Sequence, residues 1–182
     1  MIRNIEQEIL EIVADNQDDN LACTEKLLSF IGKLDISNNL LEFHKAFKQV
    51  ANEEPTQIDN ETLELRLALI QEELDELKEA YYKADLIAQL DAYVDLIYVL
   101  FGSIVASGMQ KIVIEAFLEV HRNNMSKLLE QDEAIEFSMN NENTELYVEE
   151  SGIKDMYVIK KSNGKVTKPK SYKPVDLSKF IC

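Results

Sequence analysis

Apolar residues recur at helical spacing through most of the chain. Between residues 63 and 77 they follow steps of four and three, at Leu63, Leu67, Ile70, Leu74 and Leu77, which predicts the buried face of an α-helix. Residues 85–105 are apolar almost throughout, except for Asp91 and Asp95, and predict a second helix. Ser107 and Gly108 should end this helix and return the chain antiparallel to it.

Four further stretches are predicted to be helices. Two short amphipathic helices are expected at 2–14 and 21–33. Ser37 or Asn38 can cap the next helix, whose stripe is Leu40, Phe43, His44, Phe47 and Val50. Pro55 lies in a loop, after which Asp59 or Asn60 caps the long helix that ends near Tyr82 to Ala84. A last helix is expected over 110–130.

From residue 131 the pattern changes toward strands. ELYVEES and DMYVIKK are rich in β-favouring residues and are separated by a Ser151-Gly152 turn, which predicts a β-hairpin or irregular flap. We therefore expect an all-α, antiparallel helix bundle with a small C-terminal β element. Its parts should be an N-terminal helical extension at 1–35, a helical bundle at 36–130 and a hairpin or tail at 131–182.

Acidic residues occupy unusual positions in the two central helices. Glu72, Glu73 and Glu76 share one helix sector away from the leucine stripe, and Asp91 and Asp95 stand one turn apart in the apolar helix. A glutamate-rich helix surface is usually a solvated face. That account does not explain two aspartates among Leu, Ile, Val and Tyr, because buried carboxylates cost several kcal/mol unless a cation compensates them. A hard divalent cation, Mg²⁺ above all, fits five oxygen ligands.

These residues also resemble a known family. EELDE followed by DAYVDLIYVLFG is similar to the all-α nucleoside triphosphate pyrophosphohydrolase superfamily, which includes MazG-type enzymes and phosphoribosyl-ATP pyrophosphohydrolase. The resemblance extends to a MazG-related subgroup of phages and bacteria through LEFHKAF (41–47), RLALIQEEL (66–74), EVHRNNMSK (119–127) and GKVTKPKSYKP (164–174). Two positions depart from the pattern: Ala92 stands where the ExxD motif has glutamate, and Asn123 where the subgroup has serine.

The resemblance implies a bundle of four core helices and a reaction. The reaction is Mg²⁺-dependent hydrolysis of a nucleoside triphosphate between the α and β phosphates, with Mn²⁺ as a substitute metal. The implied metal ligands are Glu72, Glu73, Glu76 and Asp95, with Asp91 standing in for the missing glutamate and Glu73 as the catalytic base.

Three more residues are candidate substrate contacts. His44 lies on an apolar stripe, where a core histidine bonded to a backbone carbonyl is as good an interpretation, although the resemblance favours a substrate contact. Asn124 and Lys127 continue the apolar stripe of Val113, Phe117 and Val120. Lys127 can complete the helix dipole or bind phosphate oxygens, and Asn124 can bond to phosphate, sugar or base.

Charge and composition narrow the partners. The 182 residues suffice for one well-filled core, and the net charge of −15 argues against nucleic acid. Cys23 and Cys182 form no disulfide framework, and the N-terminus lacks the apolar core of a signal peptide, so a cytoplasmic enzyme is expected. Residues 96–106 are too short for a membrane span. The two-faced long helix suggests a homodimer or higher homo-oligomer.

Two rival interpretations follow from the same acids. A di-iron carboxylate bundle needs Glu-x-x-His on two helices, and neither His44 nor His121 has a glutamate three residues before it. A non-enzymatic interaction module would present the acids as a surface for a basic partner. Stabilisation by Mg²⁺ or Mn²⁺ distinguishes this module from a metal-dependent enzyme.

Overall fold

The computed structural model describes residue 14, residues 35–141 and residues 145–181, and divides into two compact units, 1–111 and 112–182. The helices predicted at 2–14 and 21–33 fall outside the described residues, except for Ala14. The predicted division of the chain at residues 35 and 130 stays a prediction.

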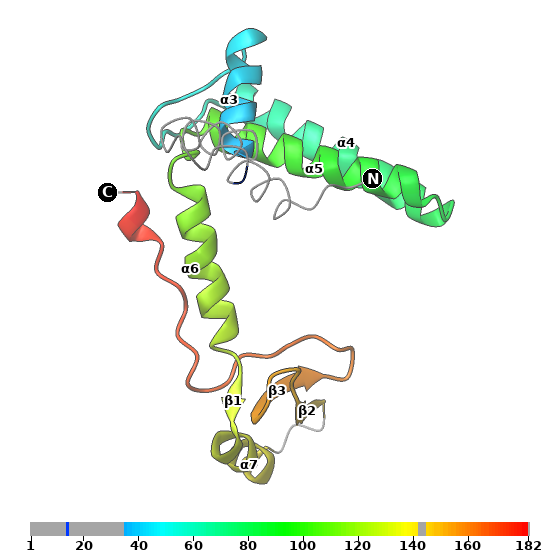
Figure 1. Cartoon of the computed structure of the whole chain (residues 1–182), viewed down its shortest axis with the longest axis vertical. Helices are drawn as coiled ribbons and strands as arrows, with labels where there is room; N and C mark the ends of the chain where they lie inside the picture. Colours follow the sequence, from blue (N-terminus) through cyan, green and yellow to red (C-terminus); the bar gives the residue numbers. More distant parts are fainter. Residues whose placement is uncertain (1–13, 15–34, 142–144, 182) are drawn as a thin grey trace. The chain divides into compact units, whose positions relative to one another are not determined.

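The first unit is built from α3 (Ile36–Ala46), α4 (Asn60–Tyr82) and α5 (Leu86–Ala106). A tight turn at residues 83–85 joins α4 to α5, so the two long helices lie side by side and antiparallel, and α3 packs against α5 (Figure 1). This hairpin carries all five predicted metal ligands. It confirms the two central helices that the hydrophobic pattern predicts.

Aspartates begin all three helices. Asp59 accepts a hydrogen bond from the Thr62 backbone N–H at 2.7 Å, and Asp85 accepts from two backbone N–H groups of α5. Such caps satisfy backbone donors that have no partner within the helix. The prediction that Ser37 or Asn38 caps α3 is wrong, because Asp35 accepts from the Asn38 N–H and starts the helix earlier.

Of the two inward faces predicted for the long helix, α4 mainly packs the one that holds Glu73 and Ala80. Leu63, Leu67 and Leu74 are 36%, 52% and 38% exposed, whereas Ile70 and Leu77 of the same stripe are half-buried, so only one edge of the leucine stripe packs. The buried residues of α4 are Thr62, Arg66 and Ala80. At about 100° per residue these three share a face with Glu73, and the exposed leucines lie on the adjacent side of the helix.

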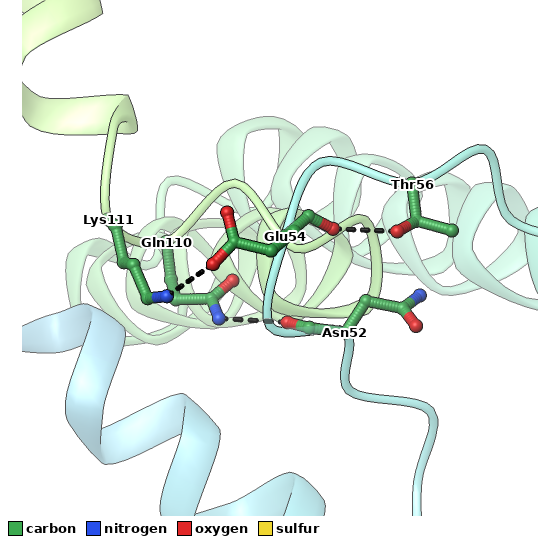
Figure 2. A network of polar contacts seen from close by, with 5 residues as sticks. All are labelled: Asn52, Glu54, Thr56, Gln110 and Lys111. Carbon is green, nitrogen blue, oxygen red and sulfur yellow. Dashed lines mark hydrogen bonds and ion pairs between the residues drawn. The ribbon is translucent and has the colours of Figure 1, made fainter. Parts of the chain in front are cut away.

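A loop fastens the end of α5. The backbone N–H of Thr56 donates to the Ser107 carbonyl at 2.9 Å, and the Asn52 side chain donates to the Ala106 carbonyl at 2.6 Å. Gln110 donates back to the Asn52 carbonyl and Lys111 pairs with Glu54, as Figure 2 shows. The bonds donated by Thr56 and Asn52 satisfy backbone carbonyl groups at the end of α5 that have no partner within the helix. The loop between α3 and α4 is thereby tied to the end of α5.

The second unit combines helices with a small sheet. It contains α6 (Val113–Met125), β1 (Leu129–Glu130), α7 (Gln131–Asn140), β2 (Leu146–Glu150), β3 (Met156–Lys161) and the 3-10 turn η1 (Ser178–Phe180). The three strands are antiparallel in the order β1-β3-β2. Leu129, Ala134 and Ile159 form its core, so α7 covers the sheet.

The mostly helical fold and the C-terminal hairpin are confirmed, because β2 and β3 pair across the predicted Ser151-Gly152 turn. Two elements differ from expectation. The helix predicted over 110–130 is the shorter α6, and α7 is a helix at the start of the segment predicted to be a hairpin or tail. A reciprocal capping box between Glu130 and Glu133 explains the start of α7, since it satisfies two backbone N–H groups in a segment with few apolar residues.

Candidate active site

The five predicted metal ligands lie on the α4–α5 hairpin. Glu72, Glu73 and Glu76 come from α4, and Asp91 and Asp95 from α5. Glu73 and Asp95 are half-buried, whereas the other three are exposed. The carboxylates therefore form an acidic group that reaches from solvent into the contact between the two helices.

Electrostatics shows that these acids act on one another. Burial raises the pKa of Glu73, and the neighbouring carboxylates of Asp95, Glu76, Glu72 and Asp91 raise it further. The lysines of the hairpin do not compensate the group: Lys78 pairs with Asp75, and Lys83 pairs with Glu79. Within the described part of the chain, none of the five acids has an ion pair. This is a concentration of uncompensated negative charge.

The chemistry of these five side chains suits a hard cation, but their positions in the structure do not yet form a metal site. All are carboxylate oxygens, the ligands that Mg²⁺ and Mn²⁺ prefer. Over residues 35–141 and 145–181, however, no three Asp, Glu, His or Cys side chains gather closely enough to hold a metal ion. Repulsion between like carboxylates favours this spread. The residues thus fit a divalent metal by chemistry and charge, and side-chain rotation would have to close the site.

The position of the missing motif glutamate is buried. Ala92 is only 3% exposed and has no ligand atom, while the preceding residue, Asp91, is exposed and contributes to the electrostatics of Glu73. Asp91 is therefore the acid that α5 offers near Asp95.

Comparison with known proteins identifies the segment that carries these acids. Residues 40–124 match the family model of phosphoribosyl-ATP pyrophosphohydrolase. The segment is therefore similar to the MazG-like NTP pyrophosphohydrolase superfamily. It spans a little under half of the chain and contains α4, α5 and most of α6. No curated protein matches the chain. The match indicates a hydrolase of the pyrophosphohydrolase type, acting on a nucleotide-like substrate.

Within the matched segment, His44 occupies the core of the first unit. Its side chain is fully buried, and its Nδ1–H donates to the Val50 carbonyl at 2.6 Å. This is the bond that the core-histidine interpretation predicts. Burial lowers the pKa of His44, and the charge of Arg66 lowers it further, so the ring is held neutral. A role of His44 in substrate binding stays a prediction.

Arg66 is the residue that sequence reasoning missed. It is 6% exposed, and its Nη2 donates to Gln49 Oε1 at 2.6 Å. Burial lowers its pKa. Among the described residues, Arg66 Nε and His44 Nε2 are buried without a hydrogen-bond partner. The sequence did hold an indication that Arg66 is buried. Helical spacing places it on the same face of α4 as Thr62, Glu73 and Ala80, and this is the face that packs.

Asn124 and Lys127 lie in the second unit. Lys127 Nζ donates to the side-chain oxygen of Asn124 at 2.7 Å, so the two predicted substrate contacts bond to each other. Asn124 is exposed and Lys127 half-buried. Their role toward a substrate stays a prediction.

The helix α5 is unusually apolar and exposed. By length and composition it could cross a membrane, the one such helix in the part of the chain that the structure describes. A single helix is a weak indication, since the core helix of a soluble protein passes the same test. Asp91 and Asp95 within it would be costly in a bilayer.

Proposed function

We propose that the chain is a Mg²⁺-dependent nucleoside triphosphate pyrophosphohydrolase that cleaves between the α and β phosphates, releasing a nucleoside monophosphate and pyrophosphate. The observation that carries the proposal is the uncompensated acidic group around Glu73, located inside the segment that matches the pyrophosphohydrolase family. An acidic site can bind a polyphosphate when divalent ions lie between the carboxylates and the phosphate groups and neutralise the negative charge of each.

The proposed metal ligands are Glu72, Glu73, Glu76, Asp91 and Asp95, with Mn²⁺ as a substitute for Mg²⁺. When bound, the metal neutralises the charge of the polyphosphate and lowers the pKa of water. The short turn between α4 and α5 keeps the ligands of the two helices within one rigid hairpin. Positioning and charge neutralisation are the main requirements of phosphoryl chemistry, so no covalent nucleophile is needed.

Glu73 is the proposed general base. Its pKa is raised by burial and by four neighbouring carboxylates, which makes it a better proton acceptor than an ordinary glutamate. It would take the proton of the attacking water as the bridging P–O bond breaks. The proposed substrate contacts are His44, Asn124 and Lys127. Lys127 supplies positive charge to phosphate oxygens, and Asn124 supplies hydrogen bonds.

We further propose that the enzyme is a cytoplasmic homodimer. A stripe on α5 steps by four and three residues and stays exposed: Leu86, Leu90, Tyr93, Ile97 and Leu100. An apolar stripe of this length on a water-soluble protein marks an interaction surface. A second copy presents the same stripe, so pairing about a two-fold axis covers both at once.

The test is a substrate panel. Purified protein is incubated with Mg²⁺ and each canonical ribo- and deoxynucleoside triphosphate, together with phosphoribosyl-ATP, and pyrophosphate and orthophosphate are measured separately. Release of pyrophosphate alone, abolished by chelator, supports the proposal, and the ranking identifies the base. Release of orthophosphate would show that a different bond is cleaved. No hydrolysis of any compound, with no stabilisation by Mg²⁺, would favour the non-enzymatic module.

A further inference from the structure

The C-terminal segment of the second unit runs back along α6 and is bound to it at several points (Figure 1). The Asn123 side chain donates to the Lys173 carbonyl at 2.6 Å and accepts a hydrogen bond from the Tyr172 hydroxyl. Further along, Lys179 pairs with Glu119 at 3.2 Å. Asn123 therefore uses both ends of its amide to hold the Tyr172 ring in place.

Two lysines from distant parts of the sequence meet at this ring. The Nζ atom of Lys127 lies 5.8 Å from the ring centroid, and that of Lys168 lies 4.8 Å from it. Attraction to the aromatic face accounts for one cation. A second cation on the same ring is repelled by the first. The fold nevertheless brings both to Tyr172.

No carboxylate offsets this repulsion. Among the residues that the structure describes, neither Lys127 nor Lys168 has an ion pair, and Lys127 donates only to the neutral Asn124 side chain. The chain has 34 acidic residues and a net charge of −15, so acids are plentiful. Residues 164–174 nonetheless contain four lysines and no acid. Positive charge is thus concentrated at one place.

We propose that Lys127, Lys168 and the ring of Tyr172 form a polyphosphate-binding subsite. Each ammonium group keeps N–H donors for an external oxygen, and ammonium groups bind phosphate as point charges. A pyrophosphate unit carries enough oxygens to accept from both lysines. The inference rests on the proposed function for its ligand, the triphosphate of the substrate or the released pyrophosphate. Lys168 and Tyr172 are the residues it adds.

The test measures pyrophosphate binding without metal. The full-length protein in chelator is titrated with sodium pyrophosphate by calorimetry. Lys168→Gln should weaken binding roughly tenfold or more, the effect of losing a hydrogen bond between charged partners. Lys161→Gln is the matched control, because it removes the same charge from an exposed lysine of the same unit. Tyr172→Phe keeps the ring but loses the bond to Asn123, and should weaken binding less than Lys168→Gln.

Equal weakening by Lys168→Gln and Lys161→Gln would overturn the subsite, since it would show attraction by overall charge alone. Absence of pyrophosphate binding to the unmodified protein would overturn it as well. Hydrolysis assays on the same variants separate this failure from that of the proposed function. Unchanged binding in Lys168→Gln with Mg²⁺-dependent hydrolysis intact removes only the subsite. Lysine-specific binding without hydrolysis of any nucleotide supports the subsite and removes the enzymatic proposal.

Discussion

Glu73 on α4 and Asp95 on α5 lie close enough for their carboxylates to repel each other across the helix hairpin. After burial, Asp95 is the largest cause of the raised pKa of Glu73. Two half-buried acids from different helices, without a basic partner in the described residues, destabilise the hairpin unless a cation joins them. Binding of a divalent ion should therefore stabilise the fold.

The first prediction concerns this linkage. Saturating Mg²⁺ should raise the Tm of the unmodified protein. At a hundredfold excess of Mg²⁺ over Kd, the free energy of unfolding should increase by about 2.7 kcal/mol. Glu73→Gln should abolish most of this gain and the hydrolytic activity, because it removes a ligand charge. Without metal it should be at least as stable as the unmodified protein, since it also removes repulsion. Scanning calorimetry with and without Mg²⁺ measures both effects.

Asp75→Asn is the matched control for that series. It removes one charge from the same helix, but Asp75 is paired with Lys78 on the surface, where such pairs contribute little. It should retain the full response to Mg²⁺. A response lost equally in both variants would mean that the ion is attracted by the charge of α4 in general.

The second prediction concerns the buried contact of Gly102 on α5 with the side chains of Arg66 and His44. A Cβ at Gly102 would lie 3.0 Å from Arg66 Nη1 and 3.1 Å from His44 Nε2. Both side chains are buried and cannot turn out into solvent. Gly102→Ala should therefore destabilise the protein by about 1–3 kcal/mol, as overpacking does. Gly152→Ala, where nothing lies within 4 Å, should change the unfolding free energy by less than about 0.5 kcal/mol in denaturant titrations.

Arg66 also shows where the hydrophobic pattern stops being informative. The positions of α4 and α5, the cap at Asp59 and the common sector of the acids follow from local spacing, and the structure reproduces them. Which face of α4 packs on α5 depends on the partner helix. The leucine stripe is the more apolar face of α4, yet α5 covers the face of Thr62 and Arg66. Local sequence does not specify such tertiary choices.

The third prediction concerns the end of α5. Gly108 has φ of +71°, and a Cβ there would lie 2.0 Å from the Glu54 carbonyl oxygen. Gly108→Ala should cost more than about 2 kcal/mol, because it combines backbone strain with a clash against backbone. The loss should appear in urea titrations, and hydrogen exchange should accelerate at Asn52 and Thr56, whose N–H groups bond to the end of α5. Unchanged exchange there would contradict the role of the loop as an anchor.

The fourth prediction is a pH dependence. The folded-state pKa of His44 is lowered from its ordinary value of 6.5, chiefly by burial, so the unfolded chain binds a proton more readily. The contribution of His44 to the free energy of unfolding is fully present above pH 6.5 and is lost as pH falls from 6.5 through the folded-state pKa. Urea titrations across this range should show a flatter dependence in His44→Gln. His121→Gln, at the exposed second histidine, should keep the original slope.

The last prediction tests the exposed stripe of α5. If a second copy covers Leu90, Tyr93 and Ile97, then Ile97→Asp places a carboxylate in an apolar interface without a partner, which costs several kcal/mol. Light scattering after size exclusion should show a dimer for the unmodified protein and a monomer for the variant. Met139→Asp on α7 is the control, because this side chain is 80% exposed yet lies outside the stripe. A dimer that survives Ile97→Asp unchanged would place the subunit contact on another surface.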